Sequence, residues 1–384
     1  MNFDNKEKPM VKKERLVNLF CRLAKIKSPS GQEEGITIEV VKELTRLGLK
    51  VMRDGYGNVV AKMAGVGQPI ILCGHLDTVP VGQDKEIVPI VEKGVIRSDG
   101  KTILGADNKD FIAAIIEMLC VISEDSLPHR SLEIVLTREE EQIARGAVNL
   151  DMSLLEGKEC LIADNAAPLG EITLSAPYTD KFEVTVRGKE AHVKKPEAGI
   201  DAIRAVASLI SRMPLGRVND VTTANVSFIS GGLAGIIEKT EFAELSKQPS
   251  NSVPNIVKFF GEVRGLKKDL VQETFSEIDR LCCLVGKETG VVIEFVIKKL
   301  NDGYMHEEKD PFLQKIASVF LQQGRQPRFE PTIGGSDANV LNKYGIKSVV
   351  ISSGEKNNHT CNEQIAVEDL VELADFLVSF VTTL

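Results

Sequence analysis

Tryptophan is absent from this chain of 384 residues, and aromatic residues make up only 5% of it. A surface on which bases or sugar rings stack is therefore not expected. An excess of positive charge is also absent, because 47 Lys and Arg residues face 55 Asp and Glu residues, for a net charge of -8. This balance argues against a dedicated nucleic-acid-binding protein. No apolar stretch is long enough to span a bilayer, so we expect no membrane-embedded part.

Segments typical of export and of disulfide frameworks are missing as well. The first fifteen residues are charged throughout and lack the apolar core and cleavage site of a secretory signal. The seven cysteines are odd in number and form no Cys-x-x-Cys pair. We therefore expect buried free thiols in a reducing compartment, and a cytoplasmic location.

The chain does contain many short apolar runs that alternate with helical periodicity. The residues Ile70 to Cys73 run directly into Gly74 and His75, as in a strand buried on both faces of a parallel sheet. Similar runs occupy residues 132–136 and 160–163, with helical patterns between them. The alternation predicts an α/β fold with a mostly parallel, doubly wound sheet.

The pattern changes after residue 177. Alternating apolar and polar residues indicate half-exposed antiparallel strands, in the order strand, helix, strand, strand, helix, strand. This order predicts a ferredoxin-like α+β domain. The doubly wound pattern then resumes, so we expect a discontinuous larger domain, 1–177 and 299–384, with an inserted domain at 178–298.

Histidine and acidic residues follow several of the predicted strands. Ligands of doubly wound sheets bind beyond the carboxyl ends of the strands. His75 and Asp77 lie two apart, so they share one side of an extended chain and suit a metal ligand with a carboxylate that orients it. The full candidate set comprises His75, Asp107, Glu140, Glu141, Asp164 and His359.

These residue types suit a pair of metal ions, which lie about 3.5–4 Å apart in hydrolases and share a bridging carboxylate. Oxygen and imidazole donors without thiolates favour zinc, with manganese or cobalt as substitutes. Chemistry alone does not decide among the three consecutive glutamates at 139–141.

Six ordered motifs resemble those of the dinuclear zinc exopeptidases and amidohydrolases, a family that includes peptidase T, dipeptidase V and aminoacylase-type enzymes. The motifs lie at residues 74–80, 98–107, 137–147, 191–200, 334–339 and 359–363. The sequence Ser-Asp-Gly-x-Thr-Ile-Leu-Gly-Ala-Asp at 98–107 is most similar to the peptidase T (tripeptidase) branch.

The resemblance implies that each chain binds two Zn²⁺ ions as cofactors, with Mn²⁺ or Co²⁺ as substitutes. It also implies a role for each candidate residue. The implied roles are one zinc ion held by His75 and Asp164, a second held by Glu141 and His359, a bridging carboxylate at Asp107, a general base at Glu140 and an orienting carboxylate at Asp77. Counting from Thr137, and back from Gly146, selects Glu140 and Glu141 as the family's pair.

The resemblance also implies residues that contact a small peptide substrate. The inserted domain would serve as a lid or dimerisation domain. His192 in it would stabilise the oxyanion, in many relatives across the interface of a homodimer formed through this domain. Asn225 and Arg264 match positions that bind a substrate carboxylate, which an Arg fork pairs with two hydrogen bonds. The loop with Gly335 and Ser336 would offer backbone donors to the same ligand.

The implied activity is metal-dependent hydrolysis of small peptides by an aminopeptidase or tripeptidase. An N-acyl-amino-acid deacylase or dipeptidase that uses the same site is the alternative, and a non-catalytic peptide-binding protein is a third hypothesis. Three segments depart from the family's pattern: Asn108 to Phe111 replaces the usual Asp-Lys-Ala-Gly, residues 193–195 after His192 are bulky and basic, and residues 233–250 form a longer segment than usual. None of the departures removes a predicted ligand or base.

Overall fold

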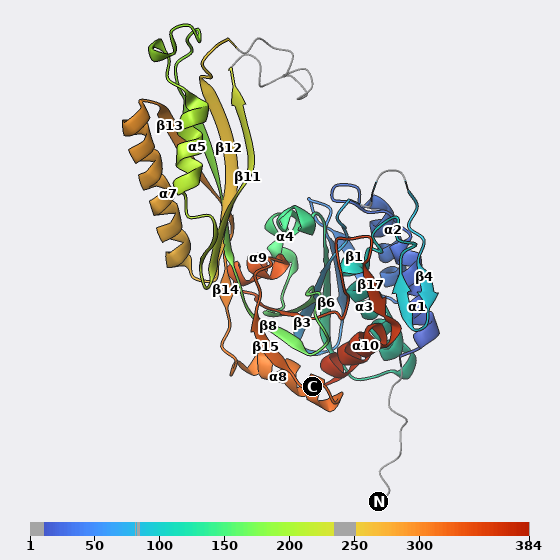
Figure 1. Ribbon diagram of the computed structural model, residues 1–384. Coiled ribbons are helices and arrows are strands. Elements are labelled where there is room, and N and C mark those ends of the chain that lie inside the picture. Colours follow the sequence, from blue (N-terminus) through green and yellow to red (C-terminus); the bar gives the residue numbers. More distant parts are fainter. Residues whose placement is uncertain (1–10, 81, 83–84, 234–250, 384) are drawn as a thin grey trace, which may run out of the picture. The chain divides into compact units, whose positions relative to one another are not determined.

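The computed structural model describes residues 11–80, 82, 85–233 and 251–383 (Figure 1). The long segment at 233–250 lies outside the described residues except for its first residue. The chain divides into two compact units, one formed by Met1–Ser175 with Met305–Leu384 and the other by Ala176–Tyr304. Along the chain, the second unit interrupts the first.

The first unit is built on a mixed sheet that has nine strands within the described residues. Its order is β1-β2-β6-β3-β7-β16-β8-β14, and β15 pairs with β8. The strands are β1 (Lys50–Arg53), β2 (Val59–Met63), β3 (Val66–His75), β6 (Arg130–Thr137), β7 (Glu159–Ala163), β8 (Glu171–Ala176), β14 (Tyr304–Met305), β15 (Arg328–Pro331) and β16 (Lys347–Ile351). The central neighbours β6, β3, β7 and β16 run parallel, so their carboxyl ends meet at one edge. The expected α/β fold with a mostly parallel sheet is confirmed.

Helices cover this sheet through apolar faces. They are α1 (Lys13–Ala24), α2 (Glu34–Arg46), α3 (Ala106–Asp125), α4 (Arg145–Val148), α8 (Pro311–Gln322), α9 (Asp337–Lys343) and α10 (Val367–Thr382), with short 3-10 turns η1 (Glu140–Gln142) and η2 (Met152–Leu154). In α1 the buried Leu16, Leu19, Phe20 and Leu23 recur at the spacing of one helix face. Helix α3 is buried from Ala106 to Ile122, because it packs on β3 and contacts both α1 and α10.

A small sheet joins two distant parts of the first unit. Strands β4 (Ile90–Glu92) and β5 (Val95–Arg97) form a hairpin, and β17 (Gln364–Ala366) pairs antiparallel with β5. This pairing places the loop that precedes β17 beside the loop between β5 and α3. The first of these loops carries His359, and the second leads directly to Asp107 at the start of α3.

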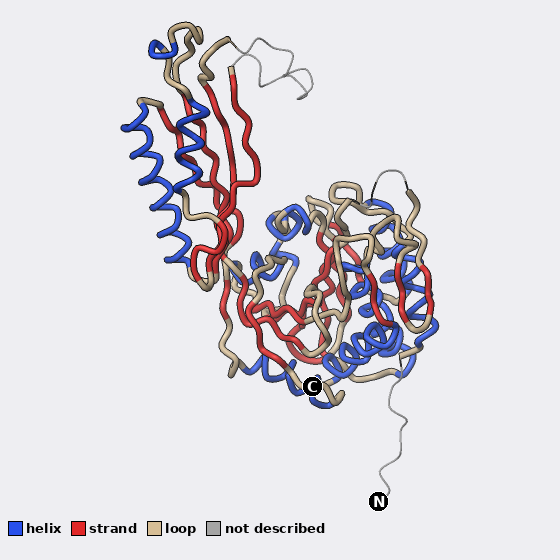
Figure 2. Tube along the Cα trace, viewed as in Figure 1, coloured by secondary structure: helices blue, strands red, loops and turns tan. Residues whose placement is uncertain are grey.

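The second unit contains a five-stranded antiparallel sheet in the order β10-β11-β12-β9-β13. Its elements are β9 (Tyr178–Arg187), η3 (Pro196–Ala198), α5 (Ala202–Arg212), β10 (Gly216–Asn219), β11 (Thr222–Gly232), β12 (Ile256–Gly265), α7 (Lys268–Thr289) and β13 (Val292–Asn301). Without β10, the strand order is that of a ferredoxin-like fold, as expected. Both α5 and α7 pack on one face of the sheet (Figure 2). Phe182, Val206 and Ile278 belong to one core.

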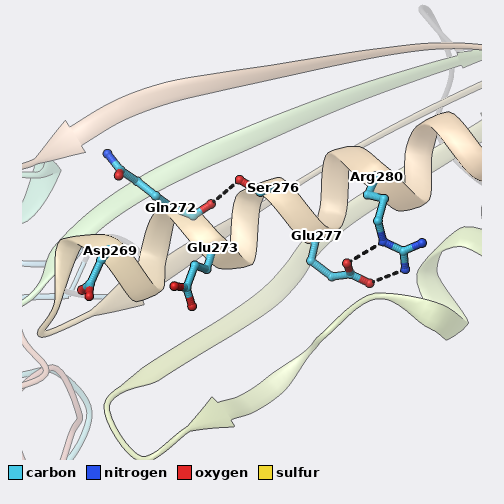
Figure 3. A pocket seen from close by; sticks show the side chains of 6 residues that line it. All are labelled: Asp269, Gln272, Glu273, Ser276, Glu277 and Arg280. Atoms are coloured by element: carbon cyan, nitrogen blue, oxygen red, sulfur yellow. Dashed lines mark hydrogen bonds and ion pairs between the residues drawn. The ribbon is translucent and has the colours of Figure 1, made fainter.

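The outer face of α7 carries a hollow whose lining residues all come from that helix (Figure 3). Glu277 and Arg280 form an ion pair there at 2.7 Å, and Ser276 Oγ donates to the backbone oxygen of Gln272 at 2.9 Å. Because the acid has its own cation and one helix supplies every side chain, this is a solvated helix surface.

All seven cysteines are unpaired. Four of them, Cys73, Cys120, Cys160 and Cys282, are buried, whereas Cys283 and Cys361 are exposed. None of the helices in the described part of the chain combines the length and apolar character needed to cross a membrane.

Candidate active site

His75 is the last residue of β3, and its side chain is only 2% exposed. Its Nδ1 lies 3.0 Å from the backbone oxygen of Asp77. Its Nε2 lies 2.9 Å from Asp107 Oδ1 and 3.8 Å from Asp164 Oδ1. A proton on Nδ1 would donate to Asp77, which leaves the Nε2 lone pair directed at the carboxylates. Burial lowers the pKa of His75, but the three aspartates outweigh it and raise the pKa well above its ordinary value.

Asp107 lies between two imidazoles. Its Oδ1 faces His75 Nε2 at 2.9 Å, and its Oδ2 faces His359 Nε2 at 3.1 Å. Asn358 Nδ2 donates to the same Oδ2 at 3.2 Å. Burial would raise the pKa of Asp107, but the two imidazoles hold it below its ordinary value. One carboxylate thus presents one oxygen to each histidine, as a bridging group must.

Two parallel strands next to β3 deliver further carboxylates. Glu140 and Glu141 begin η1 just after β6, and Asp164 follows β7 directly. Two groups of three side chains each bring one ligand atom per residue within 4.8 Å of the others: His75 with Asp107 and Glu141, and His75 with Glu140 and Asp164. Burial raises the pKa of Asp164 to about 7. Burial, reinforced by Asp164, raises the pKa of Glu140 well above its ordinary value.

The charge balance of this cluster fits divalent cations. Glu141 Oε1 is buried and makes no hydrogen bond, although His359 Nε2 lies 2.9 Å away. Asp107 and Glu141 raise the pKa of His359 to about 10, so the carboxylates draw a proton onto this imidazole. The donors are carboxylate oxygens and imidazole nitrogens, which zinc, manganese and cobalt all accept. The residues present therefore form a candidate metal site.

Asp77 has a contact that the sequence did not indicate. Its carboxylate is 3.4 Å from His75 Nδ1, in keeping with the expected orienting role. The same carboxylate also accepts hydrogen bonds from the backbone N–H groups of Glu140 at 2.9 Å and Glu141 at 3.1 Å, and from Ser30 Oγ at 2.7 Å. Asp77 therefore holds the segment that carries two predicted site residues.

Asn108, where the family usually has Asp, connects the ends of two strands. Its Oδ1 accepts from the backbone N–H of His75 at 3.3 Å, and its Nδ2 donates to the backbone oxygen of Ala163. The peptide bond between Asp107 and Asn108 is cis. A Cβ at Gly74 would lie 2.5 Å from Asn108 Oδ1, which explains the glycine before His75.

Ser336 has its polar groups engaged within the fold. It is the N-cap of α9, its N–H donates to Asn339 Oδ1 at 3.1 Å, and its Oγ accepts from Ala338 N at 3.3 Å. The capping box thus engages this N–H, and the expected contribution of the loop's backbone donors to substrate binding stays a prediction. Gly335 is exposed.

The remaining predicted substrate residues belong to the second unit, whereas the candidate metal ligands belong to the first. His192 is exposed, and its Nδ1 accepts from the backbone N–H of Lys194 at 3.1 Å. Asn225 pairs in register with Glu262, and Arg264 contacts Glu262 at 3.1 Å, so Asn225 and Arg264 share one face of the sheet. Their roles toward a substrate stay predictions.

A model of peptidase family M20/M25/M40 matches residues 71–383. The chain belongs to this family. The resemblance drawn from the six motifs is thereby confirmed, because the match contains every candidate metal ligand, from His75 to His359.

Members and neighbours of the M20/M25/M40 family resemble the chain over nearly its full length. The crystal structure of aminopeptidase PepT from Bacillus cereus ATCC 10987 has a TM-score of 0.87 and 31% identity, covering 97% of this chain and 99% of that one. A tripeptidase structure from Staphylococcus aureus has a TM-score of 0.89 and 29% identity, covering 97% and 98%. The Bacillus subtilis uncharacterized protein YqjE is 30% identical over 97% of this chain and 99% of its own.

Proposed function

We propose that this M20 peptidase is a dinuclear zinc exopeptidase that hydrolyses small peptides, as a tripeptidase or aminopeptidase. The observation that carries the proposal is the placement of the Asp107 carboxylate, with one oxygen toward His75 and the other toward His359. The substrate class is supported by two structures at 29% and 31% identity that are named tripeptidase and aminopeptidase.

In this proposal Asp107 would serve both ions, and the other ligands would differ between them. His75 and Asp164 would hold one ion, in keeping with the 3.8 Å between His75 Nε2 and Asp164 Oδ1. Glu141 and His359 would hold the other, in keeping with their contact at 2.9 Å. When bound, the pair of ions supplies Lewis acidity, which lowers the pKa of the attacking water and polarises the scissile carbonyl.

Glu140 is the proposed general base. Its carboxylate accepts a proton from the attacking water and later releases that proton to the leaving amine. Burial raises the pKa of Glu140, so its carboxylate, when ionised, is a stronger base than an exposed glutamate. Its backbone N–H donates to the Asp77 carboxylate at 2.9 Å, so Asp77 holds the backbone of the proposed base in place.

Substrate binding is proposed to involve residues of the second unit. Arg264 and Asn225, which share one sheet face, would pair with the carboxylate of a peptide. His192 would donate to the developing oxyanion, and a homodimer formed through this unit is part of the same proposal. Small peptides carry the terminal carboxylate that these groups recognise.

The test is a substrate screen on metal-depleted protein reconstituted with Zn²⁺, Mn²⁺ or Co²⁺. Tripeptides, dipeptides and N-acyl amino acids are offered in parallel, and released amino acids are identified by mass spectrometry. We expect tripeptides to be cleaved from the amino terminus, and Glu140→Gln protein from the same preparation controls for contaminating peptidases. If acylated amino acids were cleaved in preference to tripeptides, the assignment would change from tripeptidase to deacylase. If no metal supported turnover of any substrate, the proposal would be refuted.

A further inference from the structure

Glu363 belongs to the motif at 359–363, but neither the sequence nor the proposed mechanism gives it a role. Its side chain is 1% exposed and accepts hydrogen bonds from consecutive backbone N–H groups. The donors are Leu104 N at 2.8 Å, Gly105 N at 2.8 Å, Ala106 N at 2.7 Å and Asp107 N at 3.2 Å. Both carboxylate oxygens are used.

These donors lie in the turn that leads into α3, whose backbone is non-helical at Asp107 and Asn108, and they precede the regular turns of the helix. A local side chain usually caps such groups, but the N-cap of α3 is Gly105, whose φ of +72° is left-handed and which has no side chain to offer. Glu363 replaces the missing cap from a position 256 residues away in the sequence from Asp107. Its negative charge is also favourable at a helix N-terminus.

The backbone that carries Glu363 also carries a predicted ligand. Glu363 closes the loop that holds His359, and its own N–H donates to the backbone oxygen of Thr360 at 3.1 Å. The next residues form β17, whose pairing with β5 fixes this end of the loop. One side chain therefore ties the backbone of Asp107 to the loop of His359, and these two residues contact each other at 3.1 Å.

We propose that Glu363 is a positioning residue that sets the Asp107 carboxylate against His359, so that the chain binds two metal ions as a pair. The inference rests on the metal centre of the proposed function. It differs from a merely structural role, because a helix cap that only stabilised α3 would change stability without changing metal affinity in the folded protein.

A matched control separates these roles. Glu133 on β6 is also 1% exposed, and its carboxylate accepts from the backbone N–H groups of Glu156 at 3.1 Å and Gly157 at 3.0 Å. No predicted ligand lies on the segment that it holds. Glu363→Gln and Glu133→Gln each replace one acceptor oxygen by an amide donor that faces backbone N–H groups, so both should lower the melting temperature of the metal-free protein.

The deciding measurement is the affinity of metal-depleted protein for zinc, which calorimetry or competition with a chelator measures without substrate. We expect Glu363→Gln to weaken zinc affinity about 10- to 100-fold, as loss of a group that orients metal ligands does. Glu133→Gln should bind zinc as the unaltered protein does. Folded Glu363→Gln protein with unaltered zinc affinity would overturn the inference, as would an equal loss of affinity in Glu133→Gln.

Glu363→Asp is the second variant, in case Glu363→Gln does not fold. It keeps the charge and both acceptor oxygens on a side chain that is one methylene shorter, so we expect a smaller loss of zinc affinity than with Gln. Unaltered affinity in Glu363→Asp, with Glu363→Gln unfolded, would also overturn the inference. The proposed function fails separately: an unaltered chain that binds two zinc ions but cleaves no peptide would refute the peptidase activity and leave the role of Glu363 standing.

Discussion

Removing the Asp77 carboxylate should weaken metal binding chiefly by releasing the segment with Glu140 and Glu141. In Asp77→Ala, the partly buried N–H groups of those two glutamates lose a charged acceptor at 2.9 and 3.1 Å. An unsatisfied buried donor costs about 1–3 kcal/mol, and water reaches part of this segment, so the free energy of unfolding should fall by about 2 kcal/mol. Movement of the segment relieves part of this penalty and displaces the carboxylates from the site. We therefore expect zinc affinity to fall about 10- to 100-fold.

The assay pairs thermal unfolding with zinc titration of metal-depleted protein. Ser30→Ala is the matched control, because Ser30 Oγ donates to the same carboxylate at 2.7 Å and carries no ligand. This variant should lose about 1 kcal/mol of stability and bind zinc normally. If Asp77→Ala protein bound zinc and turned over peptide like the unaltered chain, the assignment of Asp77 as a positioning carboxylate would be refuted.

Three further predictions address the remaining groups. Glu140→Gln should lower kcat about 10²- to 10⁴-fold while metal analysis still finds the unaltered zinc content, and a larger fall in zinc content than in kcat would argue that Glu140 is a ligand. Asn108→Asp removes the donor to Ala163 and adds a charge beside the buried carboxylates, so its melting temperature without metal should fall and zinc should restore part of the loss. Metal-free protein should become less stable as the pH rises from about 4 to about 7. The pKa of Asp164 is raised from 3.8 to about 7, so the folded chain binds more protons than the unfolded chain in that range. Above it, the raised pKa of His359, from 6.5 to about 10, is opposed by Lys109, whose pKa burial lowers from 10.5 to about 7. Saturating zinc should flatten this decline, and melting curves that rise with pH without metal would contradict the charge balance described for the site.

Local sequence patterns predicted the site residues that lie at or just after the ends of strands. The apolar run from Ile70 to Cys73 indicated a buried parallel strand, and β3 does end at His75. Glu140 and Asp164 follow β6 and β7, which flank β3 in the same parallel sheet. Because the carboxyl ends of parallel strands meet at one edge, the order of strands and acidic residues was enough to predict that these side chains converge.

Contacts that depend on pairing between distant segments left no such pattern. The hydrogen bonds from Glu140 and Glu141 to Asp77 join residues 63 and 64 positions apart, and no periodicity signals them. The reach of Glu363 to the start of α3 follows from the pairing of β17 with β5, two strands of three residues each. Such short strands carry too few residues to specify a partner by hydrophobic pattern.

The buried carboxylates of the first unit differ in whether backbone N–H groups donate hydrogen bonds to them. This difference separates positioning groups from candidate ligands. Asp77 and Glu363 accept hydrogen bonds from backbone N–H groups of the segments that bear Glu140, Glu141 and Asp107. Glu141, in contrast, has a buried oxygen without a backbone donor, and this oxygen faces the candidate ligand His359 at 2.9 Å. A carboxylate with backbone donors is stable in the interior without a metal ion, whereas one without them requires a cation. Metal removal should therefore loosen the ligand side chains while the backbone held by Asp77 and Glu363 keeps its place. Amide hydrogen exchange can check this directly, since residues 104–107 and 140–141 should remain protected in metal-free protein.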